Sequence, residues 1–441
     1  MSALAKILLE KGYEVSGSDL HGSPIVEHLQ AMGAKIFQGH RAEHVQGVDA
    51  IVVSSAIHED NPEVTAAKAQ GIQRLHRSDV NAALLNAVKG IAVAGAHGKT
   101  TTTSMIGVTL DHAGLQPTII IGGEVDYLDG NARLGKGEYL VSEADESDGS
   151  FLKLRPHIAV VTNVENDHMD HYGSMDNIRK AFRQFIENVD RETGYAVLCF
   201  DNENIRNIAR AVDRKFISYA IDHPADYQAV NIVPEGAGIA FDVQHGADNL
   251  GRVKLNIPGR HNVLDAMATI VTGLSVGLTV PQLADGLACF HGAKRRFETK
   301  GRVHGVWVVD DYAHHPTEIA TTLTAARQTK PGRLICAFQP HRYTRTQLLA
   351  KEFGAAFKAA DILVLTDVYS AGEDPIPGVS GETILAEVAE QTGQDVTYIA
   401  RREDVAAYLA TIVRPGDLVM TMGAGNICEA GPELLALLEK K

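Results

Sequence analysis

The sequence predicts an α/β protein with three domains, and three observations support this prediction. Its 441 residues exceed what a single hydrophobic core normally holds. Apolar stretches of strand length alternate with helical stretches along most of the chain, which is typical of parallel sheets covered by helices. New strand–helix series begin near residues 89 and 296, so we expect domains at 1–88, 89–295 and 296–441.

The first domain is predicted to be Rossmann-like because short helices and strands alternate from its first residues. The helices are expected at 3–11, at 24–32 and from Ser78 onward, and the strands at 13–19, 49–55 and 72–75. A sheet of this type normally starts with a strand and a glycine-rich turn. This chain begins at the helix that would follow them.

The other two domains follow the same alternation of strands and helices. In the central domain, strands are expected at 91–95, 138–145, 157–164 and 195–200, and a long helix at 262–278. Residues 216–257 alternate polar and apolar side chains between Gly and Asp turns, which predicts a small antiparallel insert. The third domain is predicted to be Rossmann-like, with strands at 306–313, 333–340, 361–368, 395–400 and 417–425.

Composition restricts the classes of function. The chain is 45% hydrophobic and 22% charged, as in globular proteins, and has no apolar run long enough to cross a bilayer. The first helical stretch contains Lys6, Glu10 and Lys11, so we interpret it as part of a cytoplasmic protein rather than as a signal peptide. A net charge of −14 argues against nucleic-acid or anionic-membrane binding. Four widely spaced cysteines predict reduced thiols.

The strongest motif is a phosphate-binding loop between a strand and a helix. IAVAG is the strand, and the turn consists of Gly95, Ala96, His97, Gly98, Lys99, Thr100 and Thr101. Backbone N–H groups at the start of a helix bind anions, and glycines let the phosphates come close. Lys99 is expected to reach the β- and γ-phosphates of ATP, and Thr100 to bind Mg²⁺. Only two residues separate the glycines, fewer than in the usual motif.

Two polar segments follow later strands of the central domain. EADESDGSF (143–151) holds four carboxylates in six residues, and we expect Glu143, at the strand end, to bind magnesium. Asp148 is interpreted as part of a solvated loop. In the second segment, His168 stands near Asp167 and Asp170. It fits a metal ligand, a base or a hydrogen-bonded turn residue equally well.

Three further segments carry polar residues. Asn262, at the start of the long helix, fits either a helix cap or an adenine contact. Asp310, Asp311, His314 and His315 fit either a metal site or a polar pocket facing ATP. Arg342 and Arg345 suit a carboxylate or a phosphate, since guanidinium groups bind both.

Together these segments resemble the Mur ligases. The matching segments run in family order and cover nearly the whole chain: AGAHGKTTTT, EADESDGSF, VTNVENDHMDHY, PGRHN, GAKRRF, VDDYAHHPTE, FQPHRYTRT, DVYSAGEDPI and GAGNI. The resemblance implies an ATP- and Mg²⁺-dependent ligase that joins L-alanine to the lactoyl carboxylate of UDP-N-acetylmuramate. ATP phosphorylates the carboxylate, and the amine of alanine then attacks the acyl phosphate.

The resemblance also implies roles for individual residues. Lys99, Glu143, His168 and Arg345 are expected to act in catalysis, and Thr100, Glu143 and His168 to bind magnesium. Besides the phosphate loop, the expected ATP contacts are His261, Asn262, Arg296 and Asp311. The L-alanine and acyl region is expected to include Tyr312, His314, Arg342 and Arg345. The expected UDP-sugar contacts are Asp19, Ser54, Ser55, His76 and Arg77.

The resemblance departs from the family at the start of the chain. Family members begin with a strand and a G-x-G-G-x-G-M-S turn that binds the UDP phosphates, and Met1 and Ser2 align with the end of that turn. We expect the strand and turn to precede Met1 in the native protein, and their removal to open the first sheet at its middle. An intact mass equal to the 47.4 kDa of this chain would contradict that expectation.

Two alternative functions remain from the sequence alone. The first is another ATP-dependent amide ligase, acting on a murein tripeptide or a folate, although DESDGSF and QPHRYTRT argue against it. The second is an inactive nucleotide-binding regulator. Glycine or serine in place of L-alanine, and a monomer or a homodimer, also stay open.

Overall fold

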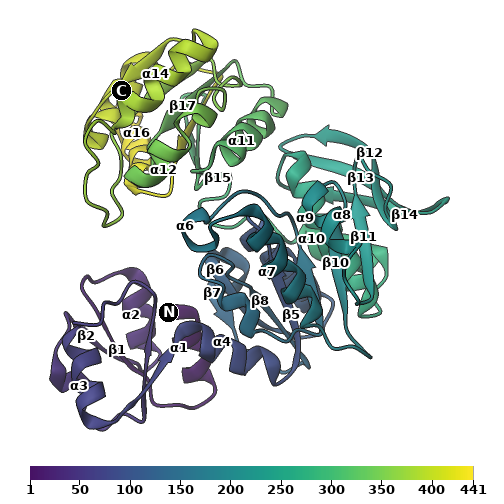
Figure 1. Cartoon of the computed structure of the whole chain (residues 1–441). Coiled ribbons are helices and arrows are strands. Elements are labelled where there is room, and N and C mark those ends of the chain that lie inside the picture. The colour runs from purple at the N-terminus through teal and green to yellow at the C-terminus, as the bar shows by residue number, and fades with distance from the viewer. Residues whose placement is uncertain (441) are drawn as a thin grey trace. The chain divides into compact units, whose positions relative to one another are not determined.

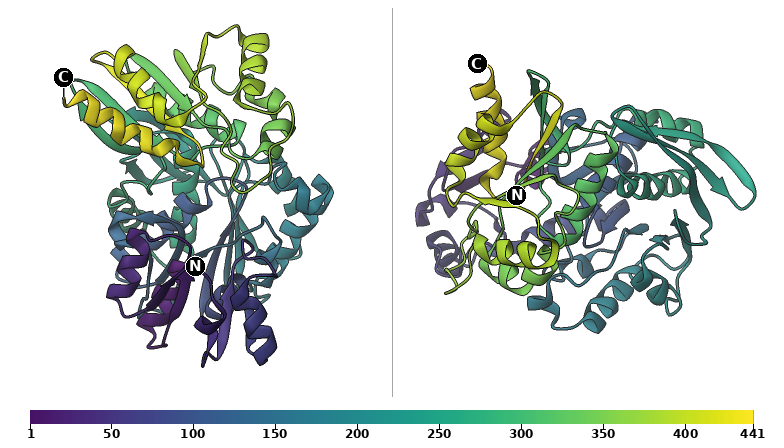
Figure 2. Two further views of the ribbon diagram at one scale, coloured as in Figure 1. Left: turned by 90° about the vertical axis from the view of Figure 1, so that its left-hand side faces the viewer. Right: turned by 90° about the horizontal axis from the view of Figure 1, so that it is seen from above.

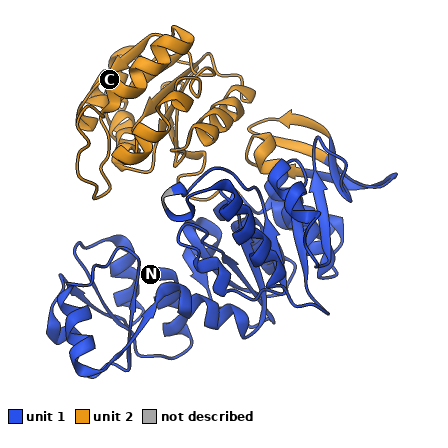
Figure 3. Ribbon diagram, viewed as in Figure 1, with its two compact units in different colours: residues 1–230, 242–253, 264–290 blue, residues 231–241, 254–263, 291–441 orange. Residues whose placement is uncertain are grey.

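The computed structural model describes residues 1–440, apart from the side chain of Asp170. The chain divides into two compact units (Figure 3). The first comprises residues 1–230, 242–253 and 264–290, and the second comprises residues 231–241, 254–263 and 291–441. Each unit is described separately below.

The N-terminal segment of the first unit contains two separate pairs of parallel strands. β1 (Ser16–Asp19) pairs with β2 (Lys35–Gln38), and β3 (Ala50–Val53) pairs with β4 (Gln73–His76). The sheet is therefore open at its middle, as expected. The helices are α1 (Ser2–Glu10), α2 (Pro24–Ala31), α3 (Pro62–Gln70) and α4 (Arg77–Asn86). Of these elements, β2 and α3 were not predicted from the sequence.

The central sheet has ten strands in the order β14-β13-β12-β11-β10-β9-β5-β8-β6-β7 (Figure 1). The strands are β5 (Lys89–Ala94), β6 (Thr118–Val125), β7 (Gly130–Arg133), β8 (Tyr139–Glu143), β9 (Ile158–Val161), β10 (Tyr195–Cys199), β11 (Phe216–Ala220), β12 (Tyr227–Glu235), β13 (Gly238–His245) and β14 (Asp248–Leu255). β5 lies between β8 and β9 and is parallel to both. Residues that follow these three strands therefore meet at one edge of the sheet.

The helices that accompany this sheet include the one that follows the phosphate loop. They are α5 (Lys99–His112), α6 (Met169–Tyr172), α7 (Met175–Glu187), α8 (Glu203–Ala209), α9 (Arg260–Ser275) and α10 (Val280–Ala288). Thr102 through Ile106 in α5 are all buried, which is why this helix is not amphipathic.

The segment predicted as a small antiparallel insert is confirmed in part. β12, β13 and β14 are successive neighbours in the sheet joined by turns of two residues, a connection that only antiparallel strands allow, but the first strand of the segment pairs differently. β11 pairs with β10 in parallel, and β12 pairs with β11 in parallel. The strands from β11 to β14 therefore extend the central sheet. Alternating side chains predicted strands there correctly, but this alternation does not fix the direction in which strands pair.

The second unit contains a six-stranded sheet in the order β15-β16-β20-β17-β18-β19. The strands are β15 (Glu298–Val303), β16 (Val306–Asp311), β17 (Arg333–Phe338), β18 (Ile362–Leu365), β19 (Val396–Tyr398) and β20 (Asp417–Met422). All neighbours are parallel except β15, which is antiparallel to β16 and was not predicted.

Helices cover both faces of this sheet (Figure 2). They are α11 (Pro316–Gln328), α12 (Tyr343–Leu348), α13 (Ala350–Phe353), α14 (Gly381–Thr392), α15 (Val405–Ile412) and α16 (Ala430–Leu438). Neighbouring residues of one strand point to opposite faces, so Val309 packs in one core and Val308 in the other. The unit thus has the doubly wound architecture that the sequence predicts.

Two expectations about chemistry and environment can be compared with the structure. All four cysteines are free thiols, as expected, and Cys199 and Cys336 are buried. Within residues 1–440, no helix combines the length and the apolar character that crossing a membrane requires.

Candidate active site

The predicted phosphate loop joins the end of β5 to the start of α5. Gly95 has a φ of 143° and Gly98 a φ of 81°, which are conformations that other residues rarely adopt. A Cβ atom at position 95 would lie 2.1 Å from Thr162 Oγ1, and one at position 98 would lie 2.6 Å from Asp265 Oδ1. Both glycines are therefore required by backbone conformation and by close packing.

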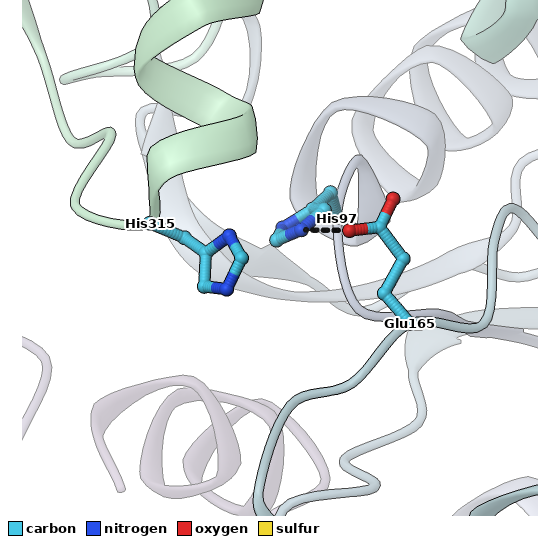
Figure 4. A group of neighbouring side chains, drawn as sticks. All are labelled: His97, Glu165 and His315. Atoms are coloured by element: carbon cyan, nitrogen blue, oxygen red, sulfur yellow. Dashed lines mark hydrogen bonds and ion pairs between the residues drawn. The ribbon is translucent and has the colours of Figure 1, made fainter. Parts of the chain in front are cut away.

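Residues after β9 hold the phosphate loop in place. The backbone N–H of His97 donates to Asn163 Oδ1 at 2.8 Å, and its carbonyl accepts from Thr162 Oγ1 at 2.6 Å and Asn163 Nδ2 at 2.9 Å. The His97 side chain lies 3.2 Å from Glu165 Oε2 through Nε2 (Figure 4). These hydrogen bonds fix the loop between two strands before any ligand contributes.

Lys99 is the first residue of α5, and its ammonium group points back into the loop. Its Nζ donates to the carbonyl oxygens of Gly95 and Ala96 and, at 2.7 Å, to Glu146 Oε1. Burial opposes its charge, but the Glu146 carboxylate raises the pKa of Lys99 above its ordinary value. Lys99 is therefore a cation located where a phosphate would enter the loop.

Glu143 lies beside the phosphate loop, as the sequence predicts. It ends β8 and pairs in register with Val93 of β5. Its Oε1 accepts a hydrogen bond from the backbone N–H of Gly122 at 2.6 Å. Thr100 lies in the same region. Gly123 is the residue after Gly122, and a Cβ atom added to Gly123 would lie 3.1 Å from Thr100 Cγ2. A hydroxyl and a carboxylate are oxygen donors of the kind that Mg²⁺ takes.

His168 precedes α6 and approaches a carboxylate that the sequence had not singled out. Its Nε2 lies 3.6 Å from Glu146 Oε1 and 3.5 Å from Asp167 Oδ2. The structure thus brings Lys99, Glu146 and His168 together at the edge where β5, β8 and β9 end. The predicted neighbour Asp170 has a side chain outside the described part of the chain.

The predicted UDP-sugar residues fall into two groups. Ser55 follows β3, and its Oγ lies 3.2 Å from Nε2 of His76, which ends β4. Arg77 forms an ion pair with Asp145 in the acidic loop after β8. Ser55 also donates to Asp148, so Ser55 and Arg77 both contact that loop. Ser54 directly precedes Ser55 in the sequence. Asp19 belongs to the other strand pair, where its Oδ1 accepts from the backbone N–H of His21 at 3.1 Å.

Asp148 differs from the expectation of a solvated side chain. Its Oδ1 accepts from the backbone N–H of Ser150 at 2.9 Å, and its Oδ2 accepts from Ser55 Oγ at 3.4 Å. The side chain is partly buried. It holds the turn of the acidic loop through Ser150 and connects that loop to the N-terminal segment through Ser55. The physical reason is the serine-rich sequence around it, which supplies donors within the same loop.

In the second unit, burial, the charge of Arg296 and hydrogen bonds act on the residues that are expected to contact the nucleoside of ATP. Burial, together with the charge of Arg296, lowers the pKa of His261 to about 4. Burial raises the pKa of Asp311 to about 6 against the opposing charge of Arg296. The two Asp311 oxygens accept from the backbone N–H groups of Phe297 and Ala313, each at 2.8 Å. Asp311 thus connects the residue after Arg296 to the end of β16.

Asn262 does not cap α9, which corrects that interpretation of the sequence. The helix begins at Arg260, so Asn262 lies inside its first turn. The side chain is 5% exposed, and its Nδ2 donates to the carbonyl of Pro258 at 2.6 Å. A cap accepts from the helix backbone, whereas this amide donates to the preceding loop.

The predicted L-alanine and acyl residues form a cluster of rings and guanidinium groups in the second unit. The rings of His314 and His341 have centroids 5.8 Å apart, and Arg345 Nη1 lies 3.3 Å from His341 Nδ1. Tyr312 packs edge-on against His314 at 5.4 Å. Burial lowers the pKa of each histidine to about 4. Arg342 is half exposed and lies 3.8 Å from Glu373.

The metal interpretation of residues 310–315 is not favoured within this unit. Asp310 pairs with Arg295 at 3.1 Å and accepts from Thr421 Oγ1 at 2.6 Å, and Asp311 accepts two backbone N–H groups. His315 accepts from the backbone N–H of Thr317, where it caps α11. These contacts agree better with the alternative of a polar pocket.

Sequence reasoning missed several residues that shape these sites. Glu146 was one of four acids within six residues, with no sequence signal to separate it from the others. Asp265 restrains the phosphate loop through Thr102 Oγ1, 2.9 Å away, although 163 residues separate the two. Thr162 and Asn163 directly follow β9. Their position at the end of a strand was the sequence feature that could have identified them as part of the site.

Comparison with known proteins gives matches along the whole chain. Family models match residues 1–89 (Mur ligase family, catalytic domain), 93–273 (Mur ligase middle domain) and 295–425 (Mur ligase, glutamate ligase domain). A UDP-N-acetylmuramate–L-alanine ligase of Pelotomaculum thermopropionicum is 48% identical over 441 residues, covering 100% of this chain and 95% of that protein. One of Geotalea uraniireducens is 48% identical over 439 residues, with 100% and 96% covered.

Solved structures agree with these sequence matches. The UDP-N-acetylmuramate-alanine ligase MurC of Thermotoga maritima has a TM-score of 0.85 at 27% identity, covering 100% of this chain and 96% of that one. A murein peptide ligase of Psychrobacter arcticus has a TM-score of 0.74 at 25% identity, with 100% and 97% covered. With the phosphate loop, its flanking acid and histidine, and three family segments in order, the chain belongs to the Mur ligase family.

Proposed function

We propose that this protein is an ATP-dependent ligase that joins L-alanine to the lactoyl carboxylate of UDP-N-acetylmuramate, giving UDP-N-acetylmuramoyl-L-alanine, ADP and phosphate. The observation that carries the proposal is full-length identity of 48% with relatives that bear the name of this activity. The reaction supplies a precursor of peptidoglycan. Because ATP and UDP-sugars are cytoplasmic compounds, we place it in the cytoplasm.

The phosphate loop binds and orients ATP in this proposal. The N–H groups from Gly98 to Thr101, at the start of α5, face the phosphates in this proposal, and Lys99 Nζ stabilises the phosphoryl group during its transfer to the lactoyl carboxylate. A carboxylate is a poor electrophile, and its conversion to an acyl phosphate provides a leaving group for the amine of L-alanine. Positioning and charge neutralisation are then the main requirements of the second step.

Magnesium is proposed to be held by oxygen and nitrogen donors of the first unit. Thr100 and Glu143 would hold one ion, and His168 a second. The Thr100 hydroxyl, in the first turn of α5, and the Glu143 carboxylate, at the end of β8, fit the donor chemistry of this cation. When bound, magnesium neutralises charge on the phosphate and carboxylate oxygens. Glu143 is positioned for this by Gly122, whose N–H holds one of its oxygens.

The remaining residues are assigned to the other parts of the substrates. In the second unit, His261, Asn262, Arg296 and Asp311 are proposed to contact the nucleoside of ATP. Arg342 and Arg345 are proposed to bind the carboxylate of L-alanine, next to Tyr312 and His314, since guanidinium groups pair with carboxylates. In the N-terminal segment, the proposed UDP-sugar contacts are Asp19, Ser54, Ser55, His76 and Arg77.

We also propose functional domains at 1–88, 89–295 and 296–441, for UDP-sugar, ATP and amino acid respectively. The limits of the three matched family segments support these boundaries.

Phosphate release with ATP, magnesium and UDP-N-acetylmuramate tests the function against its alternatives. We expect release that depends on L-alanine and yields a product heavier by one alanyl residue in mass spectrometry. Glycine and serine in place of L-alanine measure how strict the acceptor choice is. Release with a murein tripeptide alone would favour a sister ligase, and ATP binding without amino-acid-dependent release would favour a regulator.

A further inference from the structure

Glu146 is a buried carboxylate with one unsatisfied oxygen. The residue is 2% exposed, and its Oε1 accepts from Lys99 Nζ at 2.7 Å. Its Oε2 is shielded from solvent and accepts no hydrogen bond from any described residue. A carboxylate in such surroundings is costly unless a cation or donors compensate it. Lys99 is the cation that the structure provides.

The neighbouring acids of the same loop are in a different situation. Asp145 pairs with Arg77 and accepts from Ser147, while Asp148 accepts from Ser150 and Ser55. Their carboxylates are satisfied by fixed partners in the loop and the N-terminal segment. Glu146 depends instead on a lysine to which the proposed function assigns a second task.

Lys99 cannot add a phosphate contact without giving up an existing one. An ammonium group donates three hydrogen bonds, and all three go to Gly95, Ala96 and Glu146. A phosphate in the loop competes with Glu146 for the same positive charge. Once Lys99 turns toward the phosphate, Glu146 keeps only the longer contact of its Oε1 with His168 Nε2, and its buried Oε2 still accepts no hydrogen bond from the described part of the chain. A bound cation would compensate the carboxylate in place of Lys99.

The groups beside Glu146 suit such a cation. His168 Nε2 lies 3.6 Å from Glu146 Oε1, a separation that allows both atoms to bind one ion. Asp167 Oδ2 lies 3.5 Å from the same nitrogen. A carboxylate oxygen and an imidazole nitrogen lie close together there. Glu146 Oε2, which accepts no hydrogen bond from the described side chains or backbone, can supply a second oxygen to a bound cation.

We propose that Glu146 exchanges partners during the catalytic cycle: it neutralises Lys99 before ATP binds and, when Lys99 moves to the phosphates, becomes a ligand of a divalent cation together with His168. This inference rests on the proposed ATP site. It adds a ligand that neither the motif nor its spacing identifies, and it makes occupation of that cation site dependent on nucleotide binding.

Counting bound Mn²⁺ tests the exchange without relying on turnover. Free Mn²⁺ is measured by electron paramagnetic resonance while MnCl₂ is added to the whole chain saturated with AMP-PNP and UDP-N-acetylmuramate. We expect about two ions per chain for the wild type. Glu146→Gln and, independently, His168→Gln should weaken one of them by at least about tenfold, while Asp148→Asn should keep both. Two ions of unchanged affinity in Glu146→Gln would overturn the proposal, as would a single ion in the wild type.

A second measurement separates ligand exchange from a merely structural role. In EDTA, Glu146→Gln should bind AMP-PNP at least as tightly as the wild type, because Lys99 no longer leaves a carboxylate to reach the phosphates. Weaker binding in EDTA would indicate that Glu146 only supports the loop and would contradict the exchange. Absence of the alanine-containing product with a normal Mn²⁺ count would instead refute the proposed reaction alone.

Discussion

Lys99 combines a charge, a buried position and three acceptors within its own loop and the acidic loop beside it. Its place in the motif predicted a role in phosphate binding, and the structure puts its ammonium group at the phosphate loop. The residues that compete for it were not predictable, because contacts such as Lys99–Glu146 depend on how β5 and β8 pair. The roles of individual residues remain predictions that mutation can test.

Replacement of Lys99 by alanine should reduce kcat by about 10²–10³-fold or more, because stabilisation of the transferred phosphoryl group is lost. Affinity for UDP-N-acetylmuramate, measured by isothermal titration calorimetry, should stay nearly unchanged. Lys136→Ala, which removes an exposed lysine from the same unit, is the matched control for charge. An equal loss of turnover and sugar affinity in Lys99→Ala would refute the assignment.

His261 should remain neutral far below the pH at which an ordinary histidine takes up a proton. Burial and Arg296 lower its pKa from 6.5 to about 4. Between these two values the unfolded chain binds a proton that the folded chain does not, so the free energy of unfolding should fall as the pH falls through this window.

Nuclear magnetic resonance of labelled histidines measures this titration directly. Three imidazole signals, those of His261, His314 and His341, should titrate near pH 4. One of them should disappear in His261→Gln, whereas His291→Gln, at an exposed position of the same unit, should retain all three. A His261 signal that titrates at the ordinary value would show that burial and Arg296 do not act as described.

At the scale of elements, local patterns predicted most strands and helices but not all pairings. β8, β9 and β10 were anticipated from apolar runs, since strands buried on both faces are almost continuously hydrophobic. β15 escaped detection because Lys300 and Arg302 interrupt its pattern, and β12 pairs with β11 in parallel although its alternation had suggested an antiparallel insert. Asp265 on α9 likewise joins the phosphate loop through tertiary packing alone.

The turn from β5 to α5 gives a prediction that separates packing from backbone strain. In Gly98→Ala, the new Cβ would meet Asp265 Oδ1 at 2.6 Å, so ATP affinity should fall by at least about tenfold. Gly114, at the other end of α5, has a similar φ of 84° with no atom within 4 Å of an added Cβ. Gly114→Ala therefore carries comparable strain without the clash.

Fluorescent nucleotide titration of both alanine variants compares them with the wild type. Equal affinities for Gly98→Ala and Gly114→Ala would mean that the contact with Asp265 does not shape the phosphate loop.

At the scale of the whole molecule, the order of motifs predicted more than any single site. A lone phosphate loop fits many ATP-using proteins, but three successive α/β segments with DESDGSF and QPHRYTRT in order fit few families. Those segments match Mur ligase models over residues 1–89, 93–273 and 295–425. The division into two compact units was not predicted, because it depends on contacts between distant segments of the chain.

The most direct test of the central claim is mass spectrometry of the products formed from UDP-N-acetylmuramate, ATP, magnesium and L-alanine. The account predicts UDP-N-acetylmuramoyl-L-alanine and ADP in equal amounts. Without L-alanine, no amide product and at most about one ADP per enzyme molecule should form, because the first step stops at the acyl phosphate. Lys99→Ala should form both products about 10²–10³-fold or more slowly. ADP that accumulates regardless of L-alanine, or bound ATP that stays intact with all substrates present, would contradict it.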